Sequence, residues 1–96
     1  MSQRITIKHL EAKARTLNKI AGQPLEPYTR TEGGDLVACP GNYHISGAYG
    51  GYQLERMSTE GGGVTIPVNT GHIPARQCAL VIDAFILGYS AAKENA

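Results

Sequence analysis

The sequence has few cysteines and no long apolar run. Its only cysteines, Cys39 and Cys78, form neither a CxxC pair nor a Cys/His ligand spacing, so we expect buried reduced thiols rather than a zinc site. No stretch of 18 apolar residues occurs, and the opening MSQRITIKHL lacks the apolar core of a signal peptide. We therefore predict a cytoplasmic protein that does not cross a membrane.

The formal net charge is also small. A charge of +1 over 96 residues is too low to draw the whole molecule to nucleic acid or to an anionic membrane. Hydrophobic residues make up 42% of the chain and charged residues 18%, which is typical of a globular protein. The length is that of one domain, residues 1–96. A domain of this size buries a modest share of its surface, so self-association would add stability.

Signatures of catalysis and of metal binding are lacking as well. The histidines have neither i,i+4 nor HExxH spacing, so we predict no metal site and no cofactor: His9, His44 and His72. His44 and Ser46 would leave the same face of a strand, but a nucleophile also needs a histidine oriented by a carboxylate. Asp35 and Glu55 are candidates that the sequence does not place there. We therefore predict no catalytic residue and a non-enzymatic protein.

Two helices are predicted, one near each end of the chain. The first spans about 7–21, where apolar residues recur at three- and four-residue steps: Ile7, Leu10, Ala14, Leu17 and Ala21. Thr6 can cap its start, and Gly22 followed by Pro24 ends it. The second spans about 74–93 and begins at Pro74, whose fixed φ suits the first helical position.

The second helix carries more apolar surface than one small domain can cover. Its main apolar face comprises Cys78, Val81, Ile82, Phe85, Ile86 and Tyr89. The opposite row should be polar, yet it holds Leu80 and Leu87 at heptad spacing with Asp83 between them. We predict that Leu80, Asp83 and Leu87 form the interface of a homo-oligomer. The alternative is that the first helix covers both leucines within one subunit.

Glycine and tyrosine concentrate in the middle of the chain. Ten of the twelve glycines lie between Gly33 and Gly71, a pattern typical of strands joined by turns. The strands are expected at 28–31, at 35–39 resuming at 43–46 after a bulge or bend, and at 52–57, with at best a short edge strand at 64–68. The sequence thus predicts an α+β fold of order α-β-β-β-α, in which a three-stranded antiparallel meander within about 28–68 packs on two helices.

The densest group of special residues runs from Gly41 to Tyr52, GNYHISGAYGGY. Closely spaced glycines allow a ligand to reach main-chain N–H groups, although the spacing matches neither a Walker motif nor GxGxxG. The loop Gly71–Pro74 precedes a helix start, which favours an anion, and we expect it to approach this segment. We predict a site for a nucleotide-like ligand made of Tyr43, His44, Tyr49, Gly50, Gly51 and His72. The alternative is a tight strand connection in which His72 ties the loop to the sheet.

Nucleic-acid binding is a further alternative. Four tyrosines with Arg30 and Arg56 could form a surface on which bases stack. A basic first helix would add contacts to phosphates through Lys8, Arg15 and Lys19. The element order echoes the double-stranded-RNA-binding domain, but Arg76 stands alone where that family presents a lysine cluster.

One resemblance rests on the order of four motifs. GNYHISGAYGGY is followed by Glu55-Arg56-Met57, by Glu60-Gly-Gly-Gly63 and by Gly71-His-Ile-Pro74. This order resembles a recurrent type of small bacteriophage protein with no established activity, over most of the chain. The last helix departs from that pattern, because Cys78-Ala-Leu-Val-Ile82 replaces polar residues.

The resemblance implies a setting rather than an activity. It implies a protein made inside an infected bacterium, of the kind that binds host proteins, blocks defence systems or sequesters small signals. We therefore predict a small non-enzymatic binding protein that acts on a host protein in the host cytoplasm. A nucleotide sponge and a nucleic-acid-binding module are the alternatives.

Overall fold

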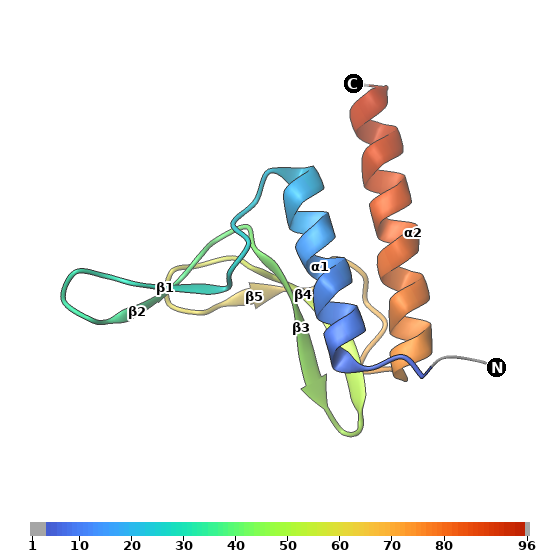
Figure 1. The fold of residues 1–96 in the computed structure, drawn as a ribbon, viewed down its shortest axis with the longest axis horizontal. Coiled ribbons are helices and arrows are strands. Elements are labelled where there is room, and N and C mark those ends of the chain that lie inside the picture. The colour runs from blue at the N-terminus through green and yellow to red at the C-terminus, as the bar shows by residue number, and fades with distance from the viewer. Residues whose placement is uncertain (1–3, 96) are drawn as a thin grey trace.

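The computed structural model describes residues 4–95, and within them two helices and five short strands follow one another (Figure 1). In chain order the elements are α1 Ile7–Ala21, β1 Tyr28–Arg30, β2 Leu36–Ala38, β3 Tyr43–Ala48, β4 Gly51–Met57, β5 Val64–Thr65 and α2 Ala75–Glu94. The predicted α+β class is confirmed. α1 has the predicted bounds, and α2 is shifted by one residue.

α1 forms where the apolar spacing predicts it. Leu10, Ala14 and Leu17 are buried, and they lie on one face of the helix. The backbone N–H of Thr6 donates to His9 Nδ1 at 3.0 Å, which secures the helix start. Gly22 ends the helix in the left-handed region, with φ 69°.

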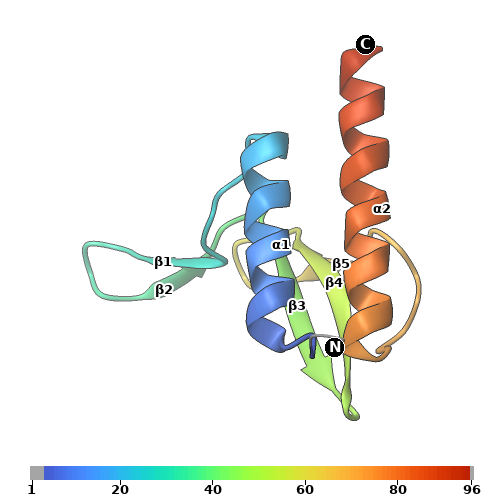
Figure 2. The same cartoon turned by 45° about the vertical axis from the view of Figure 1, so that its right-hand side comes forward.

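α1 and α2 lie side by side, run in the same direction and cover one face of the sheet formed by β3, β4 and β5 (Figures 1 and 2). Lys13 Nζ donates to Asp83 Oδ1 at 2.7 Å and joins the two helices near their middles. Lys93 Nζ donates to the Ile20 carbonyl at 3.0 Å and joins their far ends. The core between helices and sheet contains Leu10, Ala14, Leu17, Tyr43, Leu54, Cys78, Ala79 and Ile82.

α2 is buried on one side only. Ile82 has no exposed surface, whereas Leu80 and Leu87 are 65% and 72% exposed. α1 therefore does not cover the two leucines, and the single-subunit alternative for this row is wrong. Among the helices within residues 4–95, none has the length and apolar character that crossing a membrane requires.

The sheet faces alternate as an antiparallel pairing requires. β3 pairs with β4 from Tyr43 opposite Arg56 to Ala48 opposite Gly51. Tyr43 and Leu54 lie on the face that the helices cover. The other face carries a polar row, which comprises His44, Ser46, Gln53 and Glu55.

The strands that make up the meander differ from those expected. β1 and β2 form a separate hairpin that projects from the body of the molecule, and β5 takes the third place in the sheet (Figure 1). The cause is a β-bulge: the N–H of Gly41 donates to the Met57 carbonyl at 2.7 Å, and the N–H of Met57 donates to the Asn42 carbonyl at 2.8 Å. The bulge turns the chain between β2 and β3, so they are not one interrupted strand.

The edge strand expected at 64–68 is the two-residue β5, Val64–Thr65. It ends before Pro67, which cannot donate a ladder hydrogen bond.

Candidate functional site

The loop at 71–74 lies against the start of β4. Tyr52 and Ile73 exchange two backbone hydrogen bonds, of 2.8 and 2.9 Å. Gly51 makes this approach possible, because a Cβ at its position would lie 2.8 Å from the carbonyl carbon of His72. Gly51 is thus required by the packing of two backbone segments, and His72 is placed beside the β3–β4 hairpin.

Tyr49 and Gly50 form the turn of that hairpin. Their φ angles are 54° and 74°, the left-handed values that a two-residue type I′ turn requires. Tyr49 is the only non-glycine residue with positive φ within residues 4–95, and its side chain is 99% exposed. Its ring and the His72 ring are arranged edge to face, with their centroids 6.1 Å apart. Ser46 Oγ lies 3.2 Å from His72 Nε2. The side chains of Ser46, Tyr49 and His72 therefore form one cluster at the hairpin tip.

His44 and Ser46 do not form the nucleophile and base of one site. His44 Nε2 lies 3.3 Å from Glu55 Oε1, and the other Glu55 oxygen accepts a bond from Gln53 at 3.2 Å. Ser46 pairs with His72 instead. The Glu55 carboxylate therefore contacts one imidazole and the Ser46 hydroxyl contacts another. A Ser-His-carboxylate triad requires both groups to contact the same imidazole. Asp35 lies away from this face, in the β1–β2 turn.

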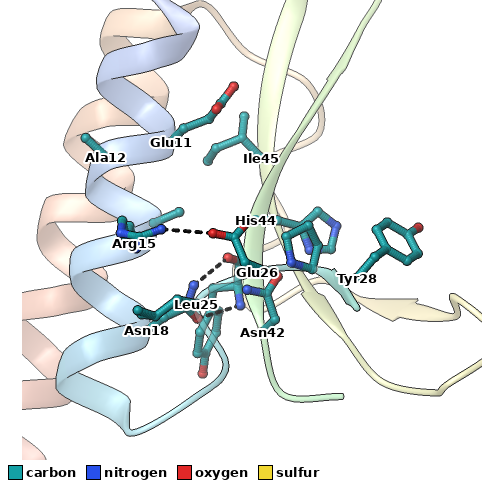
Figure 3. A pocket seen from close by; sticks show the side chains of 13 residues that line it. Glu11, Ala12, Arg15, Asn18, Leu25, Glu26, Tyr28, Asn42, His44 and Ile45 are labelled. Atoms are coloured by element: carbon teal, nitrogen blue, oxygen red, sulfur yellow. Dashed lines mark hydrogen bonds and ion pairs between the residues drawn. The ribbon is translucent and has the colours of Figure 1, made fainter. Parts of the chain in front are cut away.

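A groove with a volume of about 500 Å³ lies between α1, residues 25–28 and the first residues of β3 (Figure 3). Its apolar lining is Ala12, Ala14, Leu25, Pro27, Tyr28 and Ile45. Its polar lining includes Glu11, Arg15, Asn18, Glu26, Asn42 and His44. The buried Tyr43 also lines it. An ion pair of 3.1 Å joins Arg15 to Glu26 and so links the two walls.

Two residues that line the groove each have a buried polar atom with no hydrogen-bond partner among the described residues: Asn42 Oδ1 and His44 Nδ1. Asn42 is 1% exposed, and its Nδ2 donates to the Pro24 carbonyl at 2.8 Å, which fixes the orientation of the amide. An unpaired buried polar atom costs about 1–3 kcal/mol. Each atom has almost no solvent-accessible surface, so a partner can supply the missing bond only if the side chain turns toward the groove.

Asn18 binds the backbone of β3 at its outer edge. Its Oδ1 accepts from the Tyr43 N–H at 2.7 Å, and its Nδ2 donates to the Tyr43 carbonyl at 2.9 Å. The Asn42 carbonyl accepts a hydrogen bond from β4. The backbone N–H and C=O groups of the even-numbered residues of β3 therefore point to β4, and those of the odd-numbered residues point to the open edge of the sheet. The outward N–H and C=O groups of Ile45 and Gly47 have no partner within residues 4–95.

The aromatic and basic side chains are dispersed. The Tyr43 ring is buried against Phe85, with centroids 5.7 Å apart, and the Arg56 guanidinium lies 5.3 Å above it. Tyr28 lies on the projecting hairpin and Tyr49 at the tip of the other one. Within residues 4–95 these side chains do not form one continuous platform for bases.

The residues predicted for an oligomer interface divide into two groups. Asp83 is directed to α1 by its ion pair with Lys13. Leu80 and Leu87 instead belong to an exposed row that we call the α2 stripe: Leu80, Ala84, Leu87, Gly88 and Ala91. No group of three or more His, Cys, Asp or Glu side chains that could hold a metal ion occurs in the described part of the chain.

Among the residues that line the groove, the sequence pattern points to Tyr43 and His44 but not to Asn18 or Asn42. A signal for Asn18 exists, because it falls one turn after Ala14 on the buried face of α1. A polar residue at such a position indicates a buried hydrogen bond. The unpaired Asn42 oxygen has no counterpart in the sequence pattern.

Comparison of the chain with known protein families, with curated proteins and with solved structures finds no match.

Proposed function

We propose that the chain is a small non-enzymatic protein that binds another protein through the groove between α1, residues 25–28 and β3. The observation that carries this proposal is the groove itself, whose lining combines apolar side chains with Asn42 and His44, each of which has a buried polar atom without a partner among the described residues. Protein interfaces combine such apolar surface with a few polar groups that the partner completes. The separation of Ser46 from the His44–Glu55 pair supports binding rather than catalysis.

The resemblance to small bacteriophage proteins supplies the setting of this proposal. The partner is then a host protein in the bacterial cytoplasm, and the chain acts as a takeover or anti-defence factor.

Filling the groove tests the proposal. Ala12 is exposed on the α1 wall, so Ala12→Trp places a large ring in the groove, and Ala92→Trp puts the same ring on an exposed helical position of α2. Wild type and both variants are used as baits in infected bacteria. We expect a partner that wild type and Ala92→Trp retain and Ala12→Trp loses, with at least about tenfold weaker affinity by calorimetry. Equal capture by all three baits would place binding outside the groove.

A nucleotide-like ligand at the hairpin tip is the second candidate function. The observation that favours it is the fully exposed Tyr49 ring beside His72, at the turn that Gly50 completes. An aromatic face of this kind can stack on a base. Thermal-shift screening against cyclic and linear nucleotides should then give a stabilised protein, and Tyr49→Ala should weaken the effect. A flat screen would remove this candidate.

We also propose that the chain self-associates through the α2 stripe. The stripe alternates large and small side chains, and it contains no charge. An antiparallel crossing of two α2 helices sets Leu80 against Ala91 of the partner subunit and Leu87 against Ala84 of the partner subunit at once, because the two pairs share one midpoint. A twofold interface requires such self-complementarity.

Light scattering tests the dimer. The wild type should show a mass above one subunit, and Leu80→Glu with Leu87→Glu should return it to one. Leu36→Glu is the control, since Leu36 is similarly exposed at 61% but lies on the β1–β2 hairpin. A monomeric wild type contradicts the proposal.

A further inference from the structure

We infer that β3 binds an extended segment of the partner protein as an additional strand of the sheet. The inference rests on the proposed function and specifies how the groove is used. It is carried by the open edge of β3, where Ile45 and Gly47 present unpaired backbone groups.

The edge already binds one amide in the manner of a strand. The Asn18 side chain both accepts from the N–H of Tyr43 and donates to its carbonyl, which is what the C=O and N–H of one residue in an antiparallel neighbouring strand would do. The next outward positions, Ile45 and Gly47, offer the same donor and acceptor pair to a chain that continues along this line. Their spacing of two residues matches the repeat of an added strand.

β3 also lacks the features that protect an edge strand. Exposed edges are normally blunted by lysine, proline or a covering loop. Residues 43–48 read YHISGA, with no lysine and no proline, and Gly47 is exposed. The segment that could cover the edge, residues 25–28, instead stands off from it and leaves the groove.

The lining of the groove indicates which side chain the added strand carries there. Glu11, Ala12 and Ile45 lie close together at one end of the groove (Figure 3), and Glu11 forms no ion pair with another of the described residues. A lysine or arginine can lay its aliphatic stem on Ala12 and Ile45 and bring its charge to Glu11. The segment is therefore extended and basic at this position.

A second copy of the chain fits the edge less well. Its own β3 could pair backbone to backbone, but the side chains on its helix-facing side, Tyr43 and Ile45, pack against its own core. Nothing from it would enter the groove. A flexible segment of another protein fills both the edge and the groove, which is the mode of strand addition.

The test begins with peptides selected from a displayed random library on the full chain. For the tightest peptides, NMR measures exchange of the Ile45 and Gly47 amide protons, which should slow on binding. Methylating alternate backbone nitrogens of the peptide should weaken binding about threefold to tenfold for each hydrogen bond lost. A peptide with its lysine or arginine changed to glutamate should also bind more weakly, and Glu11→Gln should reduce that preference.

Gly47 provides a matched pair of protein variants. Gly47→Pro removes the outward N–H and fixes φ, both of which an edge strand can accommodate, and should weaken binding about fivefold. Gly47→Ala keeps the N–H, and its Cβ would lie 3.5 Å from the Tyr52 ring, an ordinary contact, so binding should persist. The spectrum of each variant reports whether it is folded, and the methylated peptides test the same bonds in wild type.

The outcomes separate this inference from the proposed function. Peptides that shift the groove resonances but tolerate backbone methylation and leave Ile45 and Gly47 unprotected overturn strand addition and leave a protein-binding groove. Selected peptides that bind elsewhere, or a library that yields no binder, contradict both. A homodimer that slows exchange at Ile45 and Gly47 without peptide assigns the edge to a second copy and overturns the inference.

Discussion

α1 and α2 cover the same face of the same sheet, yet their outward sides differ. α1 presents charged side chains to water: Lys8, Glu11, Arg15 and Lys19. α2 presents the uncharged α2 stripe. Because the support beneath the two helices is shared, the difference lies in their outward side chains alone, and the α2 stripe is the surface on which the proposed self-association depends.

The largest expected effect separates the two sides of α2. Ile82 is completely buried, so Ile82→Ala should lower the free energy of unfolding by about 2–5 kcal/mol through lost burial and a cavity. Leu80→Ala should change it by less than about 0.5 kcal/mol in the monomer. Urea denaturation at low protein concentration measures both. A loss at Leu80 as large as that at Ile82 would mean that the stripe is packed within one chain.

The second effect concerns the attachment of α1 to the sheet. Asn18→Leu leaves the N–H and carbonyl of Tyr43 buried without partners and should cost about 2–3 kcal/mol of unfolding free energy. Asn18→Asp would set a buried carboxylate oxygen against the Tyr43 carbonyl oxygen, so its cost should be at least as large at neutral pH and should fall in acid, where the protonated carboxyl can donate to that carbonyl. Equal stability of wild type and the leucine variant would show that the two hydrogen bonds contribute nothing.

The third effect is a pH dependence on the inner side of α2. Burial raises the pKa of the Cys78 thiol, so the unfolded chain releases this proton at a lower pH than the folded one. The stabilisation is fully present below the unfolded pKa of about 8.5 and is lost as pH rises above it, by at most about 1.4 kcal/mol per pH unit. The difference between wild type and Cys78→Ala, followed by denaturation from neutral to alkaline pH, isolates this contribution. A constant difference across that range would exclude it.

The smallest effect is the ion pair that joins the helices. The Lys13 and Asp83 side chains are 32% and 48% exposed, so their coupling should be about 0.2–1 kcal/mol. A double-mutant cycle with Lys13→Met and Asp83→Asn measures it, and added salt should weaken it. A much larger coupling would show that packing rather than this pair is being measured.

The helices could be predicted because their signals are local. The apolar spacing of α1 and the stop at Gly22 lie within one stretch of chain, as does the start of α2 after Pro74. The same holds for the exposed leucines of α2, whose heptad spacing is visible without a structure. These features depend on residues a few positions apart.

The sheet and the groove depend on residues far apart in the chain. The sequence located the interruption at 40–42, but not its result, because the bulge there depends on hydrogen bonds with Met57, far along the chain. The groove joins residues 11–18, 25–28 and 42–45, and no local pattern shows that these meet. Asn18 shows the limit well: its burial follows from its place on α1, but its partner, Tyr43, does not.

The shared direction of α1 and α2 has an electrostatic consequence. Parallel helices align their dipoles, so the partial negative charges of both C-terminal ends gather at one pole of the molecule, where they repel each other. Lys93, in the last turn of α2, places its ammonium on the carbonyl of Ile20 in the last turn of α1. Lys93 thus offsets partial charge at the ends of both helices, and Lys19 adds a second cation in the last turn of α1. The last turn of α2 is therefore held electrostatically to α1, the helix that forms one wall of the groove.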